Sequence, residues 1–148
     1  MDNKIKILFL CTGNSCRSQM AEGWTRHFHN ASLEVFSAGV ETHGLNPKAV
    51  EVMAEAEIDI SGHRSKHVNE FSGMEFDYVV TVCDHAREVC PWFPAKTAVL
   101  HQSFDDPPAL AQNMGTEEEK LTIYRRVRDE IRDFTRYLPE NYIHGSKQ

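Results

Sequence analysis

A cysteine and an arginine separated by five residues give the clearest sign of chemistry in this chain. Cys11 and Arg17 enclose the segment Thr-Gly-Asn-Ser-Cys, and Ser18 follows the arginine. An arginine side chain can hold two oxygens of a tetrahedral oxyanion, and a thiolate can attack its central atom. The Ser18 hydroxyl could donate a hydrogen bond to the Cys11 sulfur. The spacing therefore predicts a nucleophile, Cys11, beside an oxyanion clamp, Arg17.

The residues between Cys11 and Arg17 are predicted to bind the oxyanion. They lie between an expected strand and an expected helix, where unpaired backbone N–H groups and the helix dipole favour an anion. Gly13 permits a close approach of the backbone. The Cys16 side chain is expected to point away from the ligand and to be structural. The predicted substrate-binding loop consists of Thr12, Gly13, Asn14, Ser15, Cys16 and Arg17.

The position of Cys11 also predicts an acidic thiol. A helix N-terminus and a nearby cation both lower the pKa of a cysteine, so we expect Cys11 to be rich in thiolate. An incidental cysteine in a strand-to-helix turn is the alternative interpretation. The segment is not a Walker loop, because no Gly-Lys-Ser/Thr sequence follows it.

Two further cysteines, Cys83 and Cys90, could form a redox switch. If residues 84–89 are helical, the pair lies two turns apart, about 10.5 Å along the axis. A disulfide needs a Cα separation of about 4.4–6.8 Å, so the bond could close only if this helix unwound. Pro91 and Pro94 would leave little helix beyond Cys90. Two buried, inert cysteines are the alternative.

Asp106 could supply a proton to a departing oxygen. Removing an oxygen from an oxyanion requires a proton on the leaving group, and a carboxylic acid near the loop would provide it. Asp105 and Asp106 precede two prolines, so a solvated turn is an equal alternative from the local sequence. In the first interpretation, Asp105 positions this segment.

His63 and His67 have the spacing of two metal ligands on one face of a helix. No third ligand is evident, and a chain with eight histidines contains such spacing by chance. We therefore predict no metal site.

The elements expected to position these residues alternate between strand and helix. Residues 59–73 are polar and could include a short helix between loops. Apolar runs predict strands at residues 4–10, 33–38, 77–82 and 95–101, and helical spacing predicts helices at 18–30, 46–57 and 116–137. This pattern indicates a single α/β domain over residues 1–148 with a parallel sheet. Cys11 and Cys83 follow the first and third strands, so both should lie at the carboxyl edge of the sheet, where ligands bind.

The length, charge and apolar runs of the chain limit the classes of protein to which it can belong. A chain of 148 residues suits one domain. The net charge of −6 argues against a nucleic-acid binder, and no apolar run is long enough to cross a membrane. We therefore expect a cytoplasmic protein, in which thiols are kept reduced and four cysteines are more often reactive or buried than bridged.

Motifs along most of the chain resemble those of the thioredoxin-coupled arsenate reductases, which have the low-molecular-weight tyrosine phosphatase fold. The first and longest is Cys-Thr-Gly-Asn-Ser-Cys-Arg-Ser-Gln-Met-Ala-Glu-Gly-Trp at residues 11–24. The other matching segments are residues 37–39, 41–47, 59–61, 79–83, 104–107 and 126–131.

The resemblance implies a fold, a reaction and a partner. The fold would be a four-stranded parallel sheet flanked by helices. The reaction would be reduction of arsenate through three redox cysteines, Cys11, Cys83 and Cys90, with Asp106 as general acid and with phosphate or sulfate as substrate analogues. Thioredoxin would be the external reductant, with no bound cofactor, and we expect the enzyme to be a monomer.

Some members of the resembling family bind a potassium ion near the loop, so the resemblance suggests a potassium site here as well. Asn14, Glu22 and Ser37 match three of its ligands, but Lys66 stands where an aspartate is expected. Ser103 also departs from the family pattern, where a tryptophan is common. The basic residues 64–66 could place positive charge near the site instead of the ion.

Two other functions remain open from the sequence. A tyrosine phosphatase of the same fold would use Cys11, Arg17 and Asp106 but would not need Cys83 or Cys90. A metal- or redox-sensing protein would bind metal stoichiometrically and turn over no oxyanion. Glutaredoxin is an alternative to thioredoxin as the reductant, although the spacing of Cys83 and Cys90 favours thioredoxin.

Overall fold

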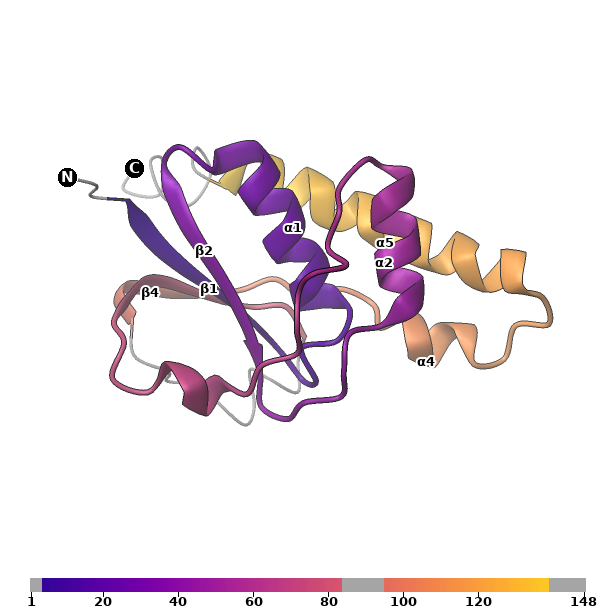
Figure 1. The fold of residues 1–148 in the computed structure, drawn as a ribbon, viewed down its shortest axis with the longest axis horizontal. Helices are drawn as coiled ribbons and strands as arrows, with labels where there is room; N and C mark the ends of the chain where they lie inside the picture. Colours follow the sequence, from indigo (N-terminus) through magenta and orange to yellow (C-terminus); the bar gives the residue numbers. More distant parts are fainter. Residues whose placement is uncertain (1–3, 84–94, 139–148) are drawn as a thin grey trace.

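A parallel sheet of four strands forms the centre of the structure, a computed structural model that describes residues 4–83 and 95–138 (Figure 1). The strands are β1 (Ile5–Cys11), β2 (Leu33–Gly39), β3 (Phe76–Thr81) and β4 (Ala95–His101). Their order across the sheet is β2-β1-β3-β4, and each neighbouring pair is parallel. The expected four-stranded parallel α/β fold is confirmed.

Strand β1 is central and is buried on both faces. Its apolar residues 7–10 have no exposed surface, as expected for an inner strand of a parallel sheet. Leu10 lies opposite Thr81 of β3, and Cys11 lies opposite Gly39 of β2. This register brings the end of β1 level with the ends of both neighbours, so Cys11 lies at the carboxyl edge of the sheet.

One face of the sheet is covered by helices. Helix α1 (Arg17–His29) packs on β1 and β2 and against the long helix α5 (Glu117–Arg136) (Figure 1). Helices α2 (Pro47–Glu55) and α4 (Pro107–Ala111) also pack against α5. The buried side chains of α5 recur at helical spacing and are Leu121, Tyr124, Val127, Ile131 and Thr135.

Side-chain caps fix where two of these helices begin. Asn46 Oδ1 accepts hydrogen bonds from the N–H groups of Lys48 and Ala49, at 2.8 and 3.2 Å, which starts α2. Thr116 and Glu119 form a reciprocal capping box at the start of α5, as the sequence predicted.

The opposite face carries an aromatic cluster. Phe71 of the short 3₁₀ helix η1 (Val68–Phe71) meets Phe36 of β2 and Phe76 of β3 with ring centroids 5.6 and 5.8 Å apart. All three ring pairs are edge-to-face, a favourable geometry for aromatic side chains. This contact anchors the polar segment that leads from α2 to β3.

The sequence located most elements within two residues but missed α4. No helix was predicted there, and a solvated turn at its first two prolines was left as an equal alternative. Residues 63–66 are not helical, so His63 and His67 do not share a helix face. The predicted helix at residues 84–89 lies outside the described residues. In the part of the chain that the structure describes, no helix is long and apolar enough to span a membrane.

Replacing Ile131 with alanine should lower the free energy of unfolding by about 2–5 kcal/mol, because the side chain is fully buried on α5. Urea unfolding followed by circular dichroism measures the change. The neighbouring variant Glu130→Ala is the control, since this side chain is 46% exposed and should change stability by no more than about 0.5 kcal/mol. Equal losses in the two variants would contradict the packing described for α5.

Candidate active site

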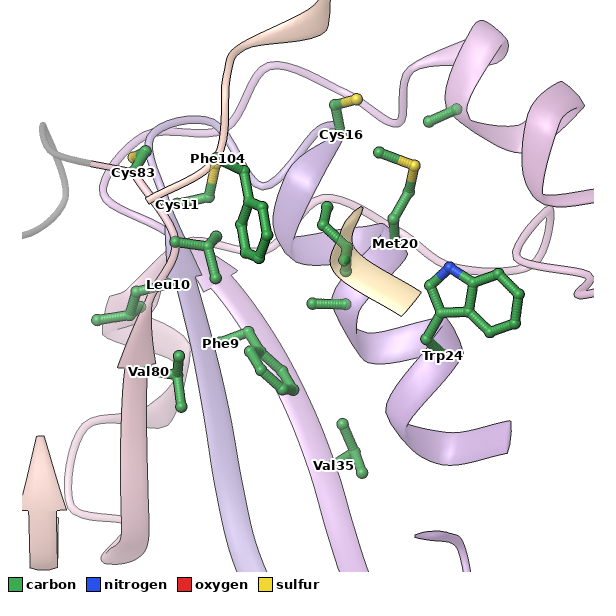
Figure 2. Close-up of a cluster of buried hydrophobic side chains, with 14 of the residues drawn as sticks. Phe9, Leu10, Cys11, Cys16, Met20, Trp24, Val35, Val80, Cys83 and Phe104 are labelled. Carbon is green, nitrogen blue, oxygen red and sulfur yellow. The ribbon is translucent and has the colours of Figure 1, made fainter. Parts of the chain in front are cut away.

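Two cysteine thiols lie together at the carboxyl edge of the sheet. Cys11 ends β1, and Cys83 follows β3 by two residues; each is 3% exposed. Thr12 Oγ1 lies 3.3 Å from Cys83 Sγ, and the Cys83 thiol is close enough to Cys11 to raise its pKa. Figure 2 shows Cys11 and Cys83 together at this edge, with Cys16 pointing away from them. Cys90, the third predicted redox cysteine, lies outside the described residues.

The loop after Cys11 has its carbonyl groups turned outward. The carbonyls of Thr12, Gly13 and Ser15 accept hydrogen bonds from the backbone N–H groups of Glu41, His43 and Asn46, at 2.9, 3.1 and 3.0 Å. Ser65 Oγ also donates to the Gly13 carbonyl, at 2.8 Å. Because these carbonyls are bonded to the segment after β2, they do not present their negative ends to the cavity that the same loop residues line, which favours an anion there.

The Asn14 side chain holds the conformation of this loop. Asn14 is fully buried and has a φ of 49°, a left-handed conformation that asparagine tolerates better than most residues. Its Oδ1 accepts from Lys66 N and Gln19 Nε2, at 2.8 and 2.9 Å. Its Nδ2 donates to Ser18 Oγ and Ser37 Oγ, at 2.8 and 3.0 Å. All the hydrogen-bonding capacity of the amide is therefore used within the protein.

Ser18 has a different partner from the predicted one. Its Oγ accepts the hydrogen bond from Asn14, and no contact from Ser18 to the Cys11 sulfur occurs among the described residues. The hydroxyl proton is not used in the Asn14 contact. In this structure Ser18 thus supports the loop rather than the nucleophile directly.

The Arg17 side chain is held by the segment that follows β4. Its Nη1 donates to the Phe104 carbonyl at 3.0 Å, and its Nη2 lies 3.4 Å from Asp106 Oδ1. The Arg17 Nε is buried and has no hydrogen-bond partner among residues 4–83 and 95–138. A buried donor without a partner is costly, so this N–H is a natural contact for an oxyanion oxygen.

The two aspartates of the predicted turn have separate contacts. Asp105 pairs with Arg126 of α5 at 3.1 Å, which ties the segment to that helix. Asp106 is the N-cap residue of α4, but its side chain caps no N–H group and faces Arg17 instead. The Asp106 carboxylate is 44% exposed and lies on the wall of the cavity, where a proton donor is needed.

The loop, Arg17 and Asp106 enclose a cavity of about 330 Å³ that Cys11 also lines. The predicted site residues that line this cavity are Cys11, Thr12, Gly13, Ser15, Cys16, Arg17 and Asp106. Asn14, Ser18 and Cys83 are buried beside the loop and are not part of the cavity wall. His43 and Asn46 also line the cavity and were not predicted to do so. Their segment was interpreted only as part of a family motif and as the cap of α2.

The pKa of the Cys11 thiol is raised well above its ordinary value, which contradicts the predicted thiolate-rich cysteine. The largest cause is the hydrogen bond with the Cys83 thiol, and burial adds to it. The charge of Arg17 and the Thr12 N–H act in the opposite direction but do not outweigh these causes. Burial also raises the pKa of Cys16, which therefore stays a neutral thiol, as expected of a structural residue.

Asn14, Glu22 and Ser37, which match potassium ligands in the resembling family, lie together in the structure. Their oxygen atoms are already used by other groups, so they do not form a potassium site. Ser37 Oγ donates to Glu22 Oε1 at 2.5 Å, and both Asn14 Oδ1 contacts are hydrogen bonds from N–H groups. The Lys66 Nζ lies 3.8 Å from Glu22 Oε1, so an ammonium group already stands beside the only charged ligand. A second cation there would be repelled.

Histidines 63 and 67 do not form a metal site either. His63 Nδ1 lies 2.9 Å from Gln19 Oε1, and His67 Nδ1 accepts from Asn69 N at the start of η1. In residues 4–83 and 95–138, no group of three or more histidine, cysteine, aspartate or glutamate side chains is placed to hold a metal.

An oxyanion loop of this form on this sheet defines a phosphatase-like protein. The chain belongs to the low molecular weight phosphotyrosine protein phosphatase family, whose profile matches residues 6–142.

Several relatives within this family are arsenate reductases. The arsenate reductase of Halalkalibacterium halodurans is 51% identical over 129 residues, which cover 87% of this chain and 91% of that protein. That of Bacillus subtilis is 51% identical over 131 residues, with 88% and 91% covered. That of Staphylococcus aureus is 46% identical over 132 residues, with 89% and 93% covered.

Solved structures of arsenate reductases and of a tyrosine phosphatase have folds similar to that of this chain. An arsenate reductase in the phosphate-binding state has a TM-score of 0.76 at 30% identity, with 90% of this chain and 95% of that chain covered. A low molecular weight protein tyrosine phosphatase from T. tengcongensis has a TM-score of 0.71 at 28% identity, with 93% and 99% covered. The fold is therefore shared by reductases and phosphatases.

Replacing Cys83 with alanine should move the alkylation of Cys11 to lower pH. The Cys83 thiol is the largest cause that raises the pKa of Cys11, so its removal should lower that pKa. Iodoacetamide labelling of the Cys11 peptide, followed by mass spectrometry across pH, measures the midpoint. Cys16→Ala is the matched control and should leave the midpoint in place. An unchanged or higher midpoint in Cys83→Ala would show that the two thiols do not interact in this way.

Proposed function

We propose that this enzyme reduces arsenate to arsenite through Cys11, Cys83 and Cys90. The observation that carries the proposal is a second buried thiol, Cys83, which lies beside Cys11 at the carboxyl edge of the sheet and contacts the hydroxyl of Thr12 in the oxyanion loop. A phosphatase needs a nucleophile and an acid, but it has no use for a second thiol behind the nucleophile. The names of the relatives point to the same reaction.

The first step would form a bond between sulfur and arsenic. The loop N–H groups and Arg17 hold the arsenate oxygens, and the Cys11 thiol passes its proton to an oxygen of the bound dianion. The Cys11 sulfur then attacks arsenic while Asp106 protonates the departing oxygen, which leaves as water. Arg17 contacts both Asp106 and the cavity, so it can exchange its carboxylate partner for the oxyanion when arsenate binds.

The second step would reduce the arsenic. The Cys83 sulfur attacks the Cys11 sulfur of the adduct, and a disulfide forms between them. The electron pair of the sulfur–arsenic bond goes to arsenic, which leaves as arsenite in the +3 state, and the Cys83 proton passes to an arsenite oxygen. Cys83 follows the strand that pairs with β1 and lies within hydrogen-bonding distance of Thr12, the residue next to Cys11, so the attack requires no rearrangement of the strands.

The third step would restore the nucleophile. Cys90 attacks Cys83, which frees the Cys11 thiol and leaves the Cys83–Cys90 pair oxidised. Thioredoxin, with a potential of about −270 mV, is a suitable reductant for that disulfide. The relay requires no bound cofactor. It fits a monomeric enzyme of the cytoplasm, where thioredoxin or glutaredoxin keeps thiols reduced.

A tyrosine phosphatase is the second candidate function. The family and the shared loop favour it, because a loop that holds arsenate also holds phosphate. Such an enzyme would use Cys11, Arg17 and Asp106 and would be indifferent to the other thiols.

Arsenate-dependent oxidation of NADPH, coupled through thioredoxin reductase and thioredoxin, separates the two functions. The wild type should turn over continuously. Cys83→Ser should release no arsenite, and Cys90→Ser should stop after one equivalent, because no second disulfide can be presented to thioredoxin.

Hydrolysis of an aryl phosphate by the same proteins is the control. Cys90→Ser should retain whatever phosphatase activity the wild type has, since the loop is intact. A wild type that cleaves the aryl phosphate but oxidises no NADPH with arsenate would be a phosphatase, and the proposed relay would be wrong.

A further inference from the structure

A buried carboxylate lies beneath the oxyanion loop. Glu22 of α1 is 6% exposed, and its Oε1 accepts the hydrogen bond from Ser37 Oγ. Its Oε2 pairs with Arg26 at 2.7 Å, but the Arg26 side chain is 44% exposed to solvent. A carboxylate removed from water needs opposing charge close by, and a solvated partner on one oxygen compensates it only in part.

Lys66 supplies a second, more buried charge to the same carboxylate. The Lys66 side chain is 14% exposed; its Nζ lies 3.8 Å from Glu22 Oε1 and donates to the Arg64 carbonyl at 2.9 Å. The backbone N–H of the same residue donates to Asn14 Oδ1. Burial lowers the pKa of Lys66, and Glu22 opposes that shift. Lys66 therefore contacts the Glu22 carboxylate through its side chain and the oxyanion loop through its backbone N–H.

A continuous chain of hydrogen bonds connects this ion pair to the loop. Ser37 has one hydroxyl proton and donates it to Glu22, so its oxygen is left to accept from Asn14 Nδ2. The orientation of Ser37 thus fixes which end of the Asn14 amide faces it. The other contacts of that amide, with Ser18 and Lys66 N, depend on the same orientation.

We propose that the Lys66 ammonium is the fixed counter-charge of Glu22 and that the pair positions the oxyanion loop through Ser37 and Asn14. Lys66 is then a positioning residue, because it touches the loop and not the cavity. Without the ammonium, negative charge at Glu22 would be uncompensated on the side that faces Asn14, and the loop would hold an anion less well. The inference rests on the proposed role of the loop in binding oxyanions.

The test is the affinity for inorganic phosphate, measured by titration calorimetry on the whole chain. The buffer cation is tetramethylammonium, which is too large to take the place of the lysine. Lys66→Met should weaken phosphate binding by roughly tenfold. Lys66→Arg keeps the charge and should stay close to the wild type. The double variant Glu22→Gln with Lys66→Met removes both charges and should recover most of the affinity.

Lys6→Met is the matched control, because Lys6 lies near the amino end of β1, at the opposite end of the strand from the loop, and should not change phosphate binding. Unchanged affinity in Lys66→Met would overturn the inference. So would a double variant that binds as weakly as Lys66→Met, because Lys66 would then act through its shape and not through Glu22. If Lys66→Met does not fold, the double variant and Lys66→Arg decide: both should bind phosphate nearly as well as the wild type.

The wild-type titration separates this inference from the proposed function. A wild type that binds no phosphate would contradict the oxyanion role of the loop itself. A wild type that binds phosphate, with Lys66→Met equal to it, would leave that role intact and remove only the role of Lys66.

Discussion

The loop that follows β1 depends on one buried amide. Asn14 adopts a left-handed backbone conformation, which costs free energy for any residue except glycine. Its side chain recovers this cost through hydrogen bonds to four residues that come from three separate segments of the chain. Because Asn14 is fully buried, losing any one of these partners would leave a polar group without compensation. The conformation of the loop at Asn14 therefore depends on the packing around this amide.

The parallel sheet provides the second constraint, which places the reactive groups. Strands β1 and β3 are neighbours and run in the same direction, so the residues that follow them meet at one edge. Phe104 N donates to the Val82 carbonyl, and the Phe104 carbonyl accepts from Arg17. The segment after β4 is thereby bonded both to the end of β3 and to the Arg17 side chain. As a result, one residue, Phe104, connects the segment that carries Cys83 to the Arg17 side chain.

The short-range features of the fold could be predicted because their signals lie within a few residues. The apolar run of β1 and the capping box of α5 are examples. The loop could be predicted for the same reason, since its spacing from Cys11 to Arg17 is a property of one strand-to-helix turn. Helix α4 was missed because two prolines in a row indicate a turn as readily as the first turn of a helix.

The contacts that could not be predicted are those between distant segments. Gln19 bonds to Asn14 and to the Arg64 carbonyl, 45 residues away, and nothing in its local sequence distinguishes it from a surface glutamine. The raised pKa of Cys11 was missed for the same reason. The helix N-terminus and Arg17 could be seen in the sequence, whereas the contact with Cys83 depends on the pairing of β1 with β3.

If Cys83 attacks Cys11 when arsenate is reduced, a single turnover leaves a disulfide between these two residues, and mapping that disulfide is the decisive experiment. One equivalent of arsenate is added to reduced Cys90→Ser, the free thiols are blocked, and the peptides are identified by mass spectrometry. We expect one equivalent of arsenite and one disulfide, which joins Cys11 to Cys83. Arsenite released with all thiols free, or a disulfide that includes Cys16, would contradict it.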